Sequence, residues 1–429
     1  MRAAAAALSA GIWVAATAAV MAQEVRYAAV VMPPPGESNC PGGMCQVEAL
    51  TGVFEALAAT EAGQRTRPVH ILQLGDSHTA GDRITGKLRA DLQARFGAGG
   101  RGVLPPGQPF DGYAPYQVRI ASAGWTSESA RLQPPAGAPS PRVGLAEMRT
   151  AGGTGALIGF ELDPGAEATV VGVCGRARGV GAGLSVEAGG LGRGLDFNGA
   201  SPDQEECREL TLTGSTSSVR LIPLKQDLVM DSVMLSGAGP GVMVSSLGVI
   251  GATLRDLASR DEAIAASELA MWRPSLIVLA FGTNEGFDDA LDGRAYETLL
   301  RVQIARMRRL APAASLMLLG APDALRSGAT SGCSADGQRA PPPSLAVVRD
   351  VQRRVAADMG VAFWDWQGRM GGACSADRLA LRDDPFMRGD RVHFTSPGAD
   401  WIGGVLSGDL LTAYDAWKVA GATAVGEAH

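Results

Sequence analysis

A short apolar run, Val69–Leu74, ends at a polar tetrapeptide, and helical spacing then extends from Arg83 to Phe96. A strand that passes through a tight turn into a helix is the usual first unit of a parallel α/β domain. The tetrapeptide is Gly75-Asp76-Ser77-His78, so a serine lies on the turn. Open α/β folds place their sites at this carboxyl edge of the sheet. The turn therefore indicates both a fold class and a place for chemistry.

Strand and helix patterns alternate again in the C-terminal half of the chain. Residues 275–281 form a nearly uninterrupted apolar run, which is typical of a strand buried on both faces of a sheet. Further strands are predicted at 315–320 and 361–366, and helices at 47–62, 252–272, 295–310, 345–359 and 397–417. These segments predict one α/β domain that is built from both ends of the chain.

The middle of the chain has a different pattern. Short strand-like runs such as Thr169–Val173 and Ser218–Ile222 alternate with Gly- and Pro-rich turns, and no helical pattern is convincing. This spacing favours an all-β sandwich over further βα units. The predicted divisions are a first α/β part at 23–115, an inserted all-β module at 116–236 and a second α/β part at 237–420.

The first 22 residues predict a secretory signal peptide. Arg2 precedes an Ala-rich apolar run that reaches Met21, and the small residue Ala22 follows. The run is near the lower length limit for a bilayer span, so an uncleaved anchor is the alternative. We expect cleavage after Ala22, a periplasmic or secreted location, and no stable membrane insertion afterwards.

Charge and cysteine content narrow the possible partners and compartments. The net charge of −6 argues against nucleic acid, because a phosphate-binding surface needs a surplus of Lys and Arg. The chain has six cysteines and four histidines, without a CxxC pair, so we expect neither a metal site nor a cofactor. Export favours oxidation, and proximity along the chain favours three disulfides: Cys40–Cys45, Cys174–Cys207 and Cys333–Cys374.

The serine of the turn has two possible roles. Ser77 can cap the following helix, because serine is a favoured N-cap residue. It can also be a nucleophile, since the free N–H groups and positive potential of a helix start would stabilise an oxyanion. Asn284, which follows the buried strand at 275–281, can add a side-chain donor at the same sheet edge, or it can simply satisfy nearby backbone.

A base for this serine is available near the C-terminus. His393 lies just before the last predicted helix, and Asp390 precedes it by three residues. Histidine is the natural base near neutral pH, and a carboxylate so close can fix its tautomer and stabilise the imidazolium. Of the other histidines, His70 lies inside a strand, His78 follows the serine and His429 is the last residue. His393 is therefore the best placed to act as the base.

These segments, in this order, resemble the SGNH, or GDSL-type, hydrolase superfamily. Gly75-Asp76-Ser77 matches its first block, Gly282-Thr283-Asn284 its third, and Asp390 with His393 its last. The second block supplies a glycine amide, for which Gly251 is the candidate and Gly248 the rival. The resemblance implies a flavodoxin-like, three-layer α/β domain with a parallel sheet. It also implies a triad of Ser77, Asp390 and His393, with an oxyanion hole formed by Ser77, Gly251 and Asn284.

Two residues depart from the superfamily pattern. His78 replaces the Leu that is common after the serine, and Glu285 stands where Asp is usual. With the β-rich insertion and the expected export, Gly-Asp-Ser-His resembles the peptidoglycan O-acetylesterases of Gram-negative bacteria. That narrower resemblance implies a carbohydrate-binding-like inserted module and O-acetylated peptidoglycan, or another acetylated polysaccharide, as substrate.

The sequence leaves two other functions open. A polysaccharide O-acetyltransferase would use the same triad and pass the acyl group to a sugar instead of water, and a non-catalytic glycan-binding protein would use only the β-rich module. No residue is assigned to substrate binding. Tyr113, Tyr116 and Trp125 near the start of the insertion are candidates to line a glycan groove, as are Trp364 and Trp366, for which a core position is the alternative.

Overall fold

The structure, a computed structural model, describes residues 30–129, 141–177, 181–197, 204–224, 228–328 and 332–426. Residues 1–32 and residues 33–429 form separate units, and the first is described only at Val30–Met32, which is irregular. The expected signal peptide at 1–22 lies outside the described residues. None of the described helices combines the length and apolarity that a membrane span requires.

A six-stranded sheet has the strand order β1-β17-β14-β13-β2-β12. All its neighbouring strands are parallel except β1 and β17, which are antiparallel. Taken in chain order, the parallel strands lie in the flavodoxin-like order 2-1-3-4-5, so the α/β fold is confirmed. The strands are β1 (Met44–Cys45), β2 (Val69–Gly75), β12 (Val242–Gly248), β13 (Leu276–Ala280), β14 (Ser315–Leu319) and β17 (Ala362–Trp364).

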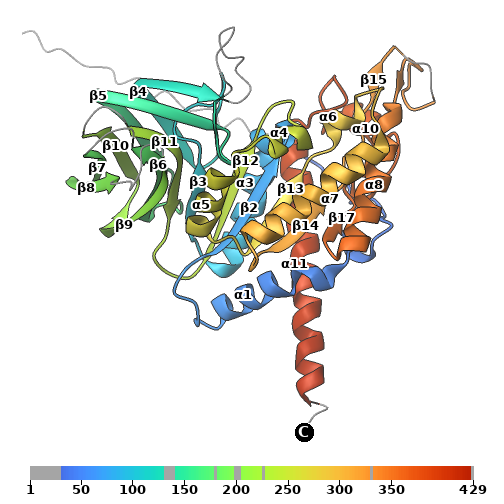
Figure 1. The fold of residues 1–429 in the computed structure, drawn as a ribbon. Coiled ribbons are helices and arrows are strands. Elements are labelled where there is room, and N and C mark those ends of the chain that lie inside the picture. The colour runs from blue at the N-terminus through green and yellow to red at the C-terminus, as the bar shows by residue number, and fades with distance from the viewer. Residues whose placement is uncertain are drawn as a thin grey trace, which may run out of the picture. The chain divides into compact units, whose positions relative to one another are not determined.

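Helices cover both faces of this sheet (Figure 1). One layer contains α1 (Thr51–Glu61), α3 (Arg83–Phe96) and α11 (Ser396–Gly426), which contact one another. The other contains α4 (Leu254–Ala258), α5 (Glu262–Trp272), α7 (Gly293–Leu310) and α8 (Pro343–Met359). Short helices are α2 (Ser77–Ala80), α6 (Thr283–Gly286), α9 (Trp366–Arg369) and α10 (Ser375–Ala380), with 3₁₀ turns at Pro41–Gly43 and Val47–Leu50.

The helix expected at 252–272 is two helices in the structure. The Asp261 side chain accepts hydrogen bonds from the Ala263 and Ile264 amides, so it caps α5 and starts a new helix there. An aspartate is a preferred N-cap because its carboxylate satisfies amides that have no partner inside the helix. The apolar periodicity continued across this break, which is why the sequence suggested a single helix.

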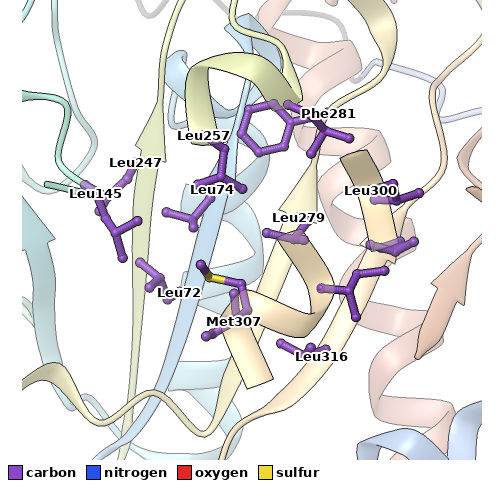
Figure 2. Close-up of a cluster of buried hydrophobic side chains, with 14 of the residues drawn as sticks. Leu72, Leu74, Leu145, Leu247, Leu257, Leu279, Phe281, Leu300, Met307 and Leu316 are labelled. Atoms are coloured by element: carbon purple, nitrogen blue, oxygen red, sulfur yellow. The ribbon is translucent and has the colours of Figure 1, made fainter. Parts of the chain in front are cut away.

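One hydrophobic core of the α/β part lies between the sheet and the layer of α4, α5, α7 and α8. Leu72 and Leu74 of β2 and Leu279 of β13 face Leu300 and Met307 of α7 (Figure 2). These side chains are at most 3% exposed, and each contributes roughly 1.5–3 kcal/mol of transfer free energy. Burial of both sheet faces explains why β2 and β13 are apolar at nearly every position.

A second, antiparallel sheet of nine strands follows α3. Seven strands are in the order β8-β7-β10-β5-β11-β6-β9, with β3 paired to β11 and β4 to β5. The end strands β8 and β9 also contact each other, so the sheet curls around a core of its own. The strands are β3 (Gly100–Leu104), β4 (Val118–Ser129), β5 (Met148–Leu162), β6 (Ala168–Ala177), β7 (Ala182–Ala188), β8 (Leu191–Phe197), β9 (Glu205–Thr216), β10 (Ser218–Pro223) and β11 (Leu228–Ser236).

The stretch around β3 joins the two sheets. Ala98 forms a parallel bridge with Val242 of β12, and a few residues later β3 pairs with β11. β3 thus belongs to the antiparallel sheet although it precedes residue 116, where the inserted module was expected to begin. The domain boundaries themselves remain a prediction.

All three disulfides expected from proximity along the chain are confirmed: Cys40–Cys45, Cys174–Cys207 and Cys333–Cys374. Cys174 and Cys207 lie directly opposite each other on β6 and β9. A small hairpin of β15 (Arg326–Ser327) and β16 (Arg339–Ala340) completes the elements.

Candidate active site

The turn after β2 brings Ser77 to the carboxyl edge of the parallel sheet. The Asp76 side chain accepts a hydrogen bond from the His78 amide and so caps α2, whose first residue is Ser77. Gly75 is required at the end of β2, because a Cβ there would lie 2.2 Å from Thr79 Oγ1 and 2.7 Å from the Ala280 carbonyl oxygen of β13. Asp76, rather than Ser77, is therefore the cap, which leaves the Ser77 hydroxyl free for another partner.

That partner is His393. Ser77 Oγ lies 3.0 Å from His393 Nε2, and His393 Nδ1 lies 2.8 Å from Asp390 Oδ2. Asp390 Oδ1 also accepts hydrogen bonds from the Val392 and His393 amides. Burial alone would raise the pKa of Asp390, but the hydrogen bonds from the His393 amide and imidazole outweigh it and lower that pKa. The group is therefore a carboxylate at neutral pH.

The loop that carries Asp390 and His393 is held at several points. Arg391 adopts a left-handed conformation, with φ of 59°, and its guanidinium donates to Asp377 of α10. The Arg391 carbonyl accepts from the Leu325 amide, and the His393 carbonyl accepts from the Arg388 amide. These bonds fix a loop without regular secondary structure, so the imidazole is held in place beside α2.

The candidate oxyanion donors lie at the ends of β12 and β13. Asn284, in α6 directly after β13, donates one amide proton to the Ala252 carbonyl oxygen at 2.9 Å. The side-chain amide has a second proton, which this bond leaves available. Gly251 lies in the turn after β12 with φ of 73°, a conformation that suits glycine. In the same turn, the Val249 amide donates to the Gly75 carbonyl oxygen, so this segment packs against the serine turn.

Glu285 is a buried residue at the same edge of the sheet. It is 7% exposed, and its Oε1 accepts from the Leu254 amide at the start of α4. Burial raises the pKa of Glu285 to about 7. The residue that departs from the superfamily pattern thus links the turn after β13 to the turn after β12.

A pocket of about 480 Å³ opens in front of Ser77 and His393. Its walls include Phe110 and Tyr116 from the segment between β3 and β4, and Ile250 from the turn after β12. Arg83 and Arg388 also line it, and Arg83 forms a two-point ion pair with Asp400. A smaller pocket of about 180 Å³ lies next to it, and Phe110 and Ile250 line both pockets. The two pockets therefore leave space for a ligand beside the serine.

Comparison with known proteins identifies the domain around this site. Residues 233–401 match the model of the GDSL-like lipase/acylhydrolase family. A solved structure of a peptidoglycan O-acetylesterase is 26% identical, with a TM-score of 0.74, over 87% of this chain and 99% of that one. The chain carries a GDSL-type, or SGNH, hydrolase domain. The family match includes Asn284, Asp390 and His393 but not Ser77, which precedes the antiparallel sheet.

Two further solved structures have much lower TM-scores. A lipase/acylhydrolase from Enterococcus faecalis is 19% identical, with a TM-score of 0.28, over 39% of this chain and 74% of that one. A family two carbohydrate esterase from Cellvibrio japonicus is 10% identical, with a TM-score of 0.26, over 70% and 98%. Both similarities are too low to support an argument. No curated protein matched the chain.

The SGNH hydrolase domain also has a buried ionic support that the sequence analysis missed. Asp82 accepts hydrogen bonds from Arg89 and Arg101, and from the Tyr116 amide, at 2.6–2.8 Å. Burial would raise the pKa of Asp82, but the two guanidinium groups outweigh it and lower that pKa. This network fixes the pocket wall at Tyr116. Its signal in the sequence was Arg89, a cation on the apolar face of α3 beside Leu88 and Leu92.

The aromatic candidates for sugar stacking divide between the pocket and the core. Tyr116 lines the main pocket, and Tyr113 lines the smaller one. Trp125 packs against the core of the antiparallel sheet. Trp364 and Trp366 are at most 3% exposed, so neither is available to a ligand.

One group of possible metal ligands is found among the described residues: Cys174, Glu205 and Cys207. Both sulfur atoms belong to the Cys174–Cys207 disulfide and cannot bind a metal as thiolates. The group therefore does not fit a metal ion.

Proposed function

We propose that this chain is an exported serine esterase that removes O-acetyl groups from peptidoglycan or a related polysaccharide. The observation that carries the proposal is the chain of contacts from Ser77 to His393 to Asp390, at 3.0 and 2.8 Å, facing a pocket. The match to a peptidoglycan O-acetylesterase over nearly its whole length supports the substrate class. The three disulfides fit an oxidising compartment, as export would provide.

The proposed reaction is acyl transfer through an acyl-enzyme. His393 Nε2 removes the Ser77 proton as Oγ attacks the ester carbonyl, while Asp390 holds the Nδ1 proton and stabilises the imidazolium. The Ser77 and Gly251 amides and the Asn284 side chain stabilise the tetrahedral oxyanion. His393 then gives its proton to the leaving sugar oxygen. Water, activated by the same imidazole, releases acetate and restores Ser77.

The antiparallel sheet has a proposed role in holding the polymer. It adjoins the pocket, because Phe110 and Tyr116 lie on the segment that connects its strands β3 and β4. We assign it as a carbohydrate-binding-like module on that basis and on the resemblance to the acetylesterases. Retention of the chain by acetylated peptidoglycan after loss of the nucleophile would support this role.

Replacement of the nucleophile tests the assignment. Ser77→Ala should abolish acetate release from O-acetylated peptidoglycan, because no acyl-enzyme can form, while circular dichroism and the thermal midpoint stay unchanged. The matched control is Ser259→Ala, which removes an exposed hydroxyl that donates to the Asp256 carbonyl. Undiminished acetate release by Ser77→Ala would refute the proposal.

The same assay separates the other two functions. Acetyl groups that appear on an added glycan rather than as free acetate would identify a transferase. A protein that retains polysaccharide but turns over neither the glycan nor an aryl acetate would be a binding protein.

A further inference from the structure

His78 directly follows the nucleophile, yet the proposed mechanism does not use it. Its side chain is 3% exposed. The ring centroid lies 5.3 Å from that of Trp366, 5.9 Å from that of Phe394 and 5.6 Å from that of His393. His78 is therefore a buried titratable group beside the proposed base, and its protonation state depends on its hydrogen-bond partners.

Both ring nitrogens of His78 face oxygen atoms that accept hydrogen bonds. Nδ1 lies 3.1 Å from Asp76 Oδ1, and Nε2 lies 3.0 Å from the Val392 carbonyl oxygen. A backbone carbonyl can only accept, and so can an ionised carboxylate. A neutral imidazole has one N–H and would leave its other nitrogen lone pair against an oxygen lone pair. The surroundings therefore match an imidazole with protons on both nitrogens.

His70 shows the opposite arrangement in the same protein. It is also buried, with Nδ1 2.9 Å from the Trp272 carbonyl oxygen and Nε2 2.7 Å from Ser245 Oγ. Ser245 Oγ accepts from the Val103 amide, so its hydroxyl proton can go to Nε2. A neutral His70 satisfies both partners, and burial lowers the pKa of His70 to about 4.

The electrostatics of His78 agree with its geometry. Burial alone would lower the pKa of His78, but the Asp76 carboxylate and the hydrogen bond to the Val392 carbonyl outweigh it and raise that pKa. The Asp390 carboxylate acts in the same direction. Two histidines with similar burial thus differ because their hydrogen-bond partners differ.

We propose that His78 is a buried imidazolium that positions the general base. One side of the ring is fixed to Asp76 in the serine turn, and the other holds the Val392 carbonyl, next to His393. This bridge sets the distance between Ser77 and His393.

Direct observation of the protons tests the first half of the proposal. Long-range ¹H–¹⁵N spectra of the labelled full chain at about pH 8 should show both His78 nitrogens protonated, where an ordinary histidine is neutral. His70 is the internal control and should show a single ring proton. A His78 with one ring proton would overturn the proposal, including the case in which the second proton lies on Asp76. This arm requires no enzymatic activity, so it is independent of the proposed function.

Kinetics test the positioning role, and this arm rests on the proposed function. His78→Gln keeps a donor for the Val392 carbonyl but removes the charge. We expect kcat to fall by roughly 10- to 100-fold with KM nearly unchanged, because a small displacement of the base has that effect.

The matched control is His70→Gln, the same change at the other buried imidazole. It should lower stability and leave kcat within a few-fold of the original value. A His78→Gln enzyme with the original kcat would overturn the positioning role. If His78→Gln fails to fold, the spectra of the unaltered chain still decide the protonation. A wild-type chain without esterase activity would refute the proposed function but not the imidazolium.

Discussion

At the scale of single residues, the side chains of the site are oriented by hydrogen bonds to neighbouring backbone groups. Asn284 donates to the Ala252 carbonyl, Asp390 accepts from two amides of its own loop, and Asp76 accepts from the His78 amide. Asn284 keeps a second amide proton, Asp390 keeps Oδ2 for His393, and Asp76 Oδ1 also accepts from the His78 ring. Preorganised groups of this kind stabilise developing charge without a cost of reorientation during the reaction.

Asn284 provides the prediction at this scale. Asn284→Asp keeps the size of the side chain but replaces its donor with an acceptor, so kcat should fall by roughly 100- to 1000-fold. Asn284→Ala should lose a comparable factor, and KM should change little in both variants. Steady-state kinetics on an aryl acetate would measure this. An Asn284→Ala enzyme within a few-fold of the original kcat would exclude Asn284 from the oxyanion hole.

At the scale of elements, the turns that follow β2 and β12 fit together without spare room. A Cβ at Gly248 would lie 2.1 Å from the Ala80 amide nitrogen of α2. The contact is with backbone, so no side chain can rotate away. The end of β12 and the helix that carries Ser77 therefore depend on the absence of a side chain at this one position.

Gly248→Ala should accordingly separate the two turns. We expect the free energy of unfolding to fall by about 1–3 kcal/mol, as overpacking usually causes, and kcat to fall with it. Gly239→Ala is the matched control: it lies in the connection between β11 and β12, and a Cβ there meets nothing within 4 Å. Urea unfolding of both variants measures the difference. Equal stabilities would show that the two turns can move apart freely.

The elements that the sequence predicted well are those whose signal is local. The apolar runs of β2 and β13 and the periodicity of α3, α7 and α8 depend on burial that each segment shows by itself. The serine turn, Asn284 and the Asp390/His393 pair could be assigned together because each follows or precedes such an element. Their proximity in space agrees with that assignment, and the proposed roles await the experiments above.

Features that depend on distant partners were not predictable. β1 has only two residues and pairs with β17 in the antiparallel direction, and β3 leaves the α/β part for the other sheet. The protonation suited to His78 is set by Val392, which lies 314 positions further along the chain. A contact at such separation has no periodicity, so no window of sequence contains it.

At the scale of the whole molecule, the two sheets share one core through α5. This helix contacts β6, β9 and β11 on one side and α7 on the other. Leu145 from the antiparallel part lies in the same buried cluster as Leu72 and Leu247 (Figure 2). Met234 of β11 belongs to this cluster as well. Glu268 of α5 is fully buried here, and its carboxylate accepts from the Leu145 amide at 2.6 Å.

Glu268 makes the stability of the molecule depend on pH. Burial raises the pKa of Glu268 to about 8, whereas an unfolded Glu titrates near about 4.3. Between these values the folded chain holds a proton that the unfolded chain releases, so the free energy of unfolding falls as pH rises, by up to about 1.4 kcal/mol per pH unit.

Glu268→Gln should therefore reduce this slope between about pH 5 and pH 8. Burial also raises the pKa values of Glu205 and Asp231, so these two residues still contribute to the slope in the variant. Glu262→Gln, at the exposed start of the same helix, is the control and should leave the slope unchanged. Urea unfolding at several pH values measures both. If the pH slope of Glu268→Gln equals that of the unaltered chain, Glu268 does not hold the proton that is released on unfolding.

The strand order has a consequence for how the protein is made. β2 lies between β12 and β13, and both are synthesised only after the entire antiparallel sheet. Non-local pairing of this kind slows folding, and the apolar strand β2 stays unpaired until β12 and β13 have been synthesised. Ser77 then meets His393, 316 positions later, just before the final helix. A chain that is still being synthesised therefore lacks the contact between Ser77 and His393, which forms only when the last segment is in place.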